Sequence, residues 1–304
     1  MNQSLPRRSF LRTLAATAAA VGAPGAIAAP ALHSALPSAS VGDKPRLLVG
    51  CCAYSYSKYL EKKRMTMEEF ILKAVELGVH GVDVTTYWLK STDPAYLREF
   101  RHFAYKNAMP FSGAAIGTNM VQPDAVKRAQ ELEKIKQWVD RTELLGASHL
   151  RVFGGEVPKD ATEEQGIGWV VEIMKPACDY AATKGVILGI ESHGGITSKG
   201  ANIVEILKRV DSPYAGCTLD ISNFPENPYP QIEACLPYAT HTHIREHYGK
   251  TKEELDLDRI WQMFAKAGYK GYMSAEYESE EDPMTGVPKL VGKIKALCQK
   301  YSSV

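Results

Sequence analysis

A short apolar run at residues 186–191 ends abruptly in Glu191, and a Gly-Gly turn follows soon after. The run is too short for a helix and is typical of a buried parallel strand that delivers its carboxylate to the C-terminal edge of a sheet. Three later segments repeat the pattern and end in Asp220, His243 and Glu276, at separations of 29, 23 and 33 residues. One strand and one helix of a (β/α)₈ barrel together occupy about 30 residues. The sequence therefore predicts an α/β fold, a (β/α)₈ TIM barrel, with these four side chains at one end.

The rest of the chain from residue 46 alternates in the same way. Further strands are expected at 47–53, 81–85, 110–116 and 149–153, and helices at 123–145, 231–236 and 256–267. Capping boxes open two other helices at Thr66 and Thr162, and the first carries an apolar face of Phe70, Ile71, Ala74 and Val75. Glycines that follow helix ends predict left-handed caps at Gly78, Gly146, Gly185 and Gly268. An open doubly wound sheet is the alternative, but no GxGxxG or Walker loop follows a strand.

The N-terminus has a different character. Arg7 and Arg8 precede an Ala-rich apolar run, and no acidic residue occurs before Asp43. This pattern is typical of a twin-arginine export signal, and the run is too short and too interrupted to be a stable membrane span. We therefore expect a signal peptide at 1–28, a linker at 29–45, a barrel domain at 46–304, and a periplasmic or other extracytoplasmic location.

The twin-arginine assignment predicts that Arg7→Lys combined with Arg8→Lys blocks export without affecting the fold. The fold should be unaffected because nothing before Arg46 belongs to an expected strand. Cell fractionation and immunoblotting measure the outcome. Export of the double variant at the normal level would contradict this route.

Composition limits the partners. The chain has 45% hydrophobic and 23% charged residues, and its formal charge of +1 becomes −2 without the three arginines of residues 1–28. No basic surface for nucleic acid is indicated, so a small polar partner is expected, and the oligomeric state stays open. The six cysteines follow neither a metal-binding spacing nor a compact disulfide framework, which favours buried thiols.

Four strand-end side chains form the candidate site. Taken singly, an acidic residue at a strand end is more often a helix cap, and a lone histidine is more often structural. Taken together, they place charge directly after buried runs, which is costly unless the groups are paired or bind metal. Three carboxylates and one imidazole suit Mn²⁺ best, with Mg²⁺, Co²⁺ or Zn²⁺ as alternatives. The ligands would be Glu191, Asp220, His243 and Glu276.

Four sequence blocks from residue 190 onward resemble the xylose isomerase-like TIM barrel superfamily of sugar phosphate isomerases and epimerases. They are Ile190–Gly195, Leu219–Asn223, His241–Glu246 and Gly268–Glu276. The resemblance covers essentially all of residues 46–304 and implies the same four metal ligands. His243 is preferred to His241 because Ile244, Arg245 and Glu246 follow it in the family's pattern.

The resemblance also implies a reaction on a keto sugar or sugar derivative. In the family the metal holds two neighbouring oxygens of a hydroxy-ketone, and Glu191 and Glu276 would be the catalytic residues that move a proton through an enediolate. β-Elimination on an oxidised (3-keto) glycoside or an inosose needs no further machinery, so a lyase is the alternative. The family pattern of ketose 3-epimerases has a substrate-binding glutamate, histidine and arginine at three positions. Here these positions hold Thr197, Asn223 and Gly249.

Other polar residues at strand ends are expected to contact a carbohydrate substrate, or to serve only as structural hydrogen-bonding groups. They are His193, Asn223, Arg245, Arg151, Asn119 and Glu156. An endonuclease of the same barrel class is disfavoured because none of the eight histidines directly follows the first three strands. A non-catalytic exported sugar-binding protein stays open, although it would not need two glutamates at one metal.

Overall fold

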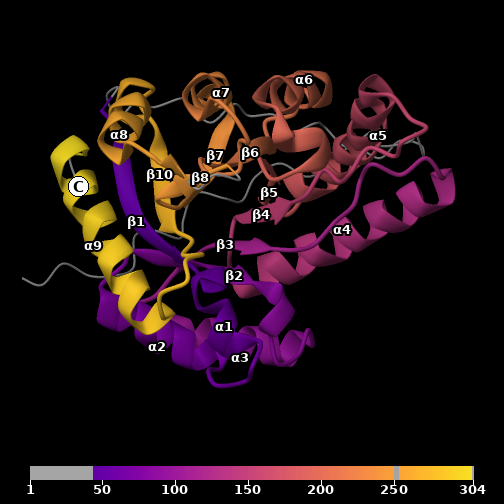
Figure 1. The fold of residues 1–304 in the computed structure, drawn as a ribbon. Helices are drawn as coiled ribbons and strands as arrows, with labels where there is room; N and C mark the ends of the chain where they lie inside the picture. The colour runs from indigo at the N-terminus through magenta and orange to yellow at the C-terminus, as the bar shows by residue number, and fades with distance from the viewer. Residues whose placement is uncertain (1–43, 250–252, 303–304) are drawn as a thin grey trace, which may run out of the picture. The chain divides into compact units, whose positions relative to one another are not determined.

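The computed structural model describes residues 44–249 and 253–302, so the expected signal peptide and nearly all of the linker lie outside the described residues. A closed parallel barrel has the strand order β1-β10-β7-β6-β5-β4-β3-β2. Pairing of β1 with β10 closes it, and the two strands lie side by side in Figure 1. The predicted (β/α)₈ barrel is thereby confirmed. Its strands are β1 (Arg46–Cys52), β2 (Gly81–Thr85), β3 (Phe111–Ala115), β4 (His149–Val152), β5 (Ile187–Glu191), β6 (Ala215–Asp220), β7 (Ala239–Ile244) and β10 (Lys270–Ala275).

Helices pack on the outer side of the barrel (Figure 1) because each presents one apolar stripe to the strands. In α6, for example, Ile203, Ile206, Leu207 and Val210 are all buried, as their spacing predicts. The helices are α1 (Ser57–Leu60), α2 (Met67–Leu77), α3 (Pro94–Lys106), α4 (Ala125–Leu145), α5 (Glu163–Ala182), α6 (Gly200–Val210), α7 (Pro228–Cys235), α8 (Leu257–Lys266) and α9 (Pro283–Tyr301). Within the two described ranges, no helix combines the length and hydropathy needed to cross a bilayer.

Local signals in the sequence place the helix ends well. Both predicted capping boxes form, at the start of α2 and of α5. All four predicted glycines adopt positive φ, between 60° and 77°. These left-handed turns let each helix end and the chain enter the next strand after a short loop.

Four details differ from the expectation. Val75 is 41% exposed, so it is not part of the buried face of α2. That face consists of Met67, Phe70, Ile71 and Ala74. Helix α4 begins two residues late, because Asp124 caps its first turn. Helix α7 begins at Pro228 rather than near residue 231, since proline is well suited to a first helical turn. A small antiparallel pair between β7 and α8 was not expected from the sequence, namely β8 (His247–Tyr248) with β9 (Glu253–Glu254).

The inside of the barrel is polar rather than filled with branched aliphatic side chains. His149 and His241 lie in it with their ring centroids 5.0 Å apart, and both are buried. Glycines on neighbouring strands make room for the rings: a Cβ on Gly189 would lie 2.3 Å from His149 Nε2 and 2.4 Å from Thr218 Oγ1. The six cysteines are buried free thiols, as the sequence predicted.

Replacing Gly189 by alanine is therefore expected to destabilise the barrel by about 1–3 kcal/mol, the usual cost of overpacking a full core. Urea unfolding of the purified protein measures this free energy. The matched control is Gly168→Ala in α5, where a Cβ meets no atom within 4 Å, and where alanine should add about 0.5–1 kcal/mol. Equal stability of Gly189→Ala and the wild-type protein would show that the barrel interior has room to spare.

Candidate active site

Barrel closure brings the four strand-end residues together. Glu191 and Asp220 are the last residues of β5 and β6, His243 lies one residue before the end of β7, and Glu276 directly follows β10. One donor atom from each of the four lies within 4.8 Å of all the others, and all four side chains are buried. Neighbouring parallel strands end at the same rim of a barrel, so residues far apart in the sequence meet there.

The two histidines of β7 have different surroundings. His241 Nδ1 accepts a hydrogen bond from the Thr242 amide at 2.8 Å, and its Nε2 lies 3.2 Å from Ser112 Oγ. His243 Nδ1 instead lies 3.2 Å from Glu191 Oε1 and 3.4 Å from Glu276 Oε1. Of the two, only His243 therefore belongs to the four-residue cluster. His241 lies in the barrel interior, two residues nearer the N-terminal end of β7.

Asp220 is held from both sides. Its Oδ1 accepts hydrogen bonds from the Ser222 amide at 2.9 Å and from the Ser222 hydroxyl at 2.5 Å. Its Oδ2 accepts from Asn223 Nδ2 at 2.7 Å and from Arg245 Nη2 at 2.5 Å. Arg245 also pairs with Glu278. Two of the predicted substrate contacts, Asn223 and Arg245, thus orient a predicted metal ligand in this structure.

Glu191 has a comparable neighbour in Arg151. The Arg151 Nε and Glu191 Oε2 atoms lie 3.0 Å apart and form a buried ion pair. Neither atom has a hydrogen-bonding partner among the described residues, so the orientation of the pair is not ideal. Burial by itself would raise the pKa of Glu191, but the charges of Arg151 and His243 outweigh it and lower that pKa to about 2.

Negative charge exceeds positive charge in this buried region. The region contains two guanidinium groups, Arg151 and Arg245, and four carboxylates, namely Asp83, Glu191, Asp220 and Glu276. Burial accordingly raises the pKa of Glu276 to about 8. With all four carboxylates ionised, a divalent cation would offset the two surplus negative charges. Glu191 Oε2 forms the ion pair with Arg151 but accepts no hydrogen bond from any described residue, so it could also contact such an ion. The donor set of three carboxylates and one imidazole therefore fits such an ion.

A cavity of about 550 Å³ opens beside this cluster, within the usual size range of ligand sites. Glu276 lies in its wall, together with the predicted substrate contacts His193, Asn223 and Arg245. A smaller pocket of about 260 Å³ shares His193 and is lined by Asn119 and Glu156. Of the six predicted contacts, only Arg151 lines neither pocket, because it lies buried beneath Phe153, with its guanidinium carbon 3.9 Å from the ring centroid.

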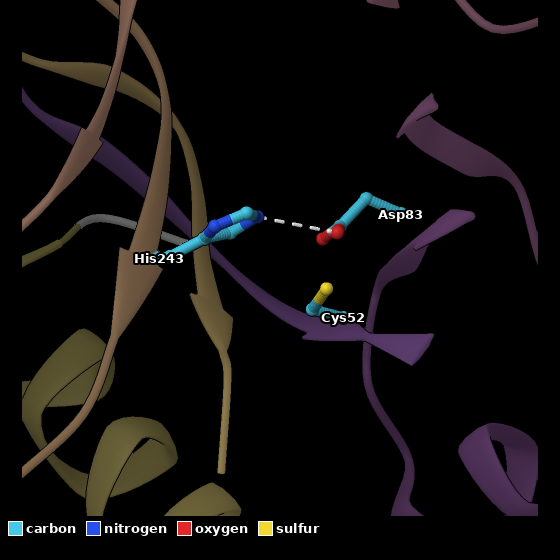
Figure 2. Close-up of side chains that lie close together, drawn as sticks. All are labelled: Cys52, Asp83 and His243. Carbon is cyan, nitrogen blue, oxygen red and sulfur yellow. Dashed lines mark hydrogen bonds and ion pairs between the residues drawn. The ribbon is translucent and has the colours of Figure 1, made fainter. Parts of the chain in front are cut away.

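Two residues near the cluster were not singled out from the sequence. Asp83 of β2 and Cys52 of β1 form a second group with His243, again with donor atoms within 4.8 Å of one another (Figure 2). An aspartate in the middle of the otherwise apolar strand Gly81–Thr85 was the available signal, because a buried carboxylate is costly unless it is paired.

The chain belongs to the xylose isomerase-like TIM barrel family, whose model matches residues 71–297. No curated protein sequence matches the chain. The match agrees with the closed barrel and with the resemblance seen in the sequence blocks.

Several solved structures share the fold. The D-allulose 3-epimerase from Methylomonas sp. has a TM-score of 0.66 and 18% identity, covering 84% of this chain and 98% of that chain. The 3-keto-D-glucoside 4-epimerase from E. coli has a TM-score of 0.67 and 13% identity, covering 83% and 100%. The D-psicose 3-epimerase from Clostridium cellulolyticum H10, solved with D-tagatose, has a TM-score of 0.66 and 16% identity, covering 84% and 96%. At these identities the likeness shows the fold alone.

Proposed function

We propose that this protein is a divalent-metal-dependent isomerase or epimerase that acts on a keto sugar or sugar derivative. The observation that carries the proposal is the buried cluster of Glu191, Asp220, His243 and Glu276, with donor atoms within 4.8 Å of one another beside a cavity of about 550 Å³. Family membership and the sugar epimerases among the structural neighbours support it. Mn²⁺ is the cation that we propose first.

The chain's own residues supply the proton transfer. Glu191 and Glu276 come from the ends of different strands, and each has a carboxylate oxygen close to His243 Nδ1, at 3.2 and 3.4 Å. One carboxylate can therefore remove a proton next to the carbonyl while the other returns it, on the same or the opposite face of the carbon. A bound cation supplies Lewis acidity, which makes that proton more acidic and stabilises the negative charge left by its removal.

The surrounding residues would bind and orient the sugar. His193 lines both pockets, so it can contact a substrate that extends from one into the other. The 3-keto-D-glucoside 4-epimerase among the neighbours makes an oxidised glycoside a natural member of the substrate panel. We further propose that the protein works outside the cytoplasm, on the basis of its twin-arginine-like N-terminus.

The decisive experiment uses the mature, Mn²⁺-loaded protein with a panel of keto sugars and 3-keto-glycosides in D₂O, followed by NMR. Isomerisation or epimerisation places deuterium on the carbon next to the carbonyl and keeps the carbon skeleton intact. Elimination instead releases an aglycone or water and leaves an unsaturated sugar, which would establish the lyase. Sugar binding with no exchange across the panel would favour a binding protein and refute the proposal.

A further inference from the structure

Asp83 is a buried carboxylate at the inner face of β2, 3% exposed, that is not one of the four predicted metal ligands. Its Oδ2 accepts a hydrogen bond from Ser274 Oγ at 2.5 Å, and its Oδ1 lies 3.3 Å from His243 Nε2. Figure 2 shows the carboxylate of Asp83 facing the ring of His243 across the barrel. Burial of this charge is costly, so its partners indicate what it does.

The two nitrogens of His243 face different groups. Nε2 faces Asp83, whereas Nδ1 faces Glu191 and Glu276 in the predicted metal site. An ionised carboxylate only accepts hydrogen bonds, so Nε2 must carry a hydrogen to bond Asp83. Nδ1 also lies 3.2 Å from a carboxylate oxygen, Glu191 Oε1, and bonds it only when the ring carries both hydrogens. With a cation held by the carboxylates of the site, the ring would be neutral, and the hydrogen on Nε2 would leave the lone pair on Nδ1 for that cation.

Asp83 is itself held in place. Ser274 of β10 is in register with His243 of β7, so one neighbouring pair of strands carries both partners of the carboxylate. Gly50 of β1, opposite Ser274, leaves room for this contact, because a Cβ there would lie 2.9 Å from Ser274 Oγ. The arrangement therefore fixes both the position and the acceptor direction of Asp83.

We infer that Asp83 is a positioning residue that sets the tautomer and the ring orientation of His243, so that Nδ1 is presented to the metal. The inference rests on the proposed metal-dependent function. A carboxylate bonded to the far nitrogen of a metal-binding histidine raises the ligand's basicity, and its loss typically weakens metal binding about 10- to 100-fold.

Asp83 and His243 could instead form a second cation site with Cys52. The contacts favour the positioning role, because both oxygens of Asp83 are already engaged by Ser274 and His243. Cys52 Sγ lies 3.7 Å from Glu276 Oε1 and 3.7 Å from Thr85 Oγ1, as expected for a weak thiol contact. A cation between Asp83 and His243 would also displace the hydrogen on Nε2.

Asp83→Asn tests the inference, because it keeps the size of the side chain but removes the charge that strengthens the hydrogen bond from Nε2, and its NH₂ group can also donate to a bare Nε2, so the tautomer is no longer fixed. Mn²⁺ affinity of the metal-free mature protein, measured by titration against a competing chelator, should fall about 10- to 100-fold. Imidazole ¹⁵N NMR of the Mg²⁺-loaded protein should show His243 protonated at Nε2 in the wild type and a shifted Nε2 signal in the variant. Circular dichroism checks folding, and if Asp83→Asn fails to fold, Ser274→Ala should weaken Mn²⁺ binding in the same direction.

Cys52→Ser is the matched control in the same cluster and should bind Mn²⁺ within about twofold of the wild type, well inside the 10- to 100-fold loss expected of Asp83→Asn. An unchanged Mn²⁺ affinity in folded Asp83→Asn would overturn the inference. The inference would also be overturned if the wild-type protein bound two Mn²⁺ ions per chain and both Asp83→Asn and Cys52→Ser bound only one. That result would assign Cys52, Asp83 and His243 to a second cation site. A wild-type protein that binds no Mn²⁺ would refute the proposed function itself, which is a separate result.

Discussion

Glu191→Gln and Glu276→Gln are each expected to suppress α-deuterium exchange by at least about 10²–10⁴-fold, the usual contribution of a general base. Each change removes a carboxylate that the proposed proton transfer requires, and it also exchanges a charged, predicted metal ligand for a neutral group. The measurement is the NMR exchange assay on whichever keto sugar the wild-type protein converts. Metal content should be measured in parallel, since metal loss would add to the effect.

Glu226→Gln is the matched control for both variants. Glu226 is exposed in the loop after β6, at the same end of the barrel, and the substitution makes the same chemical change. Its exchange rate should equal that of the wild type. If both site variants exchange deuterium as fast as Glu226→Gln, neither glutamate takes part in the chemistry. If turnover is lost in Glu276→Gln while sugar affinity persists, an enzyme is favoured over a binding protein.

Removal of the proposed cation is expected to lower the melting temperature by about 5–10 °C. An ion present at a hundred times its dissociation constant stabilises the folded state by about 2.7 kcal/mol, and each kcal/mol shifts the melting temperature of a domain near this size by about 2–4 °C. The physical reason is the surplus of buried carboxylates around His243, which repel one another without the ion. Differential scanning calorimetry before and after exhaustive chelation measures the shift.

Adding Mn²⁺ back should restore the melting temperature, and Asp220→Asn should abolish most of the response, because Asp220 is completely buried within the cluster. The four-ligand assignment would be wrong if exhaustive chelation changed neither the melting temperature nor the metal content. A response that persists undiminished in Asp220→Asn would place the ion elsewhere.

Local sequence was sufficient for most of the fold. The capping boxes at Thr66 and Thr162 and the glycines after the helices depend on residues only a few positions apart, so their hydrogen bonds could be foreseen. The alternation of strands and helices is compatible with few chain topologies, and the structure confirms the one predicted, a closed barrel. The β8–β9 pair was not foreseen because two-residue strands carry too little pattern to recognise.

The sequence by itself also determined which residues end at one rim, since Glu191, Asp220, His243 and Glu276 each follow a buried run. It did not determine the contacts between strands far apart in the chain. The choice of His243 over His241 could be made only on the family pattern, because both share one strand face, and their different partners appear only once the barrel closes.

Tertiary structure alone decided the role of the charged neighbours. Arg151 pairs with Glu191 across 40 residues, Arg245 pairs with Asp220 across 25, and Asp83 reaches His243 across 160. Whether such groups face a substrate or hold a ligand depends on distances of a few ångströms set by strand register and barrel closure. A hydrophobic pattern reports which face of a strand is buried, but it carries no information about which side chain lies opposite.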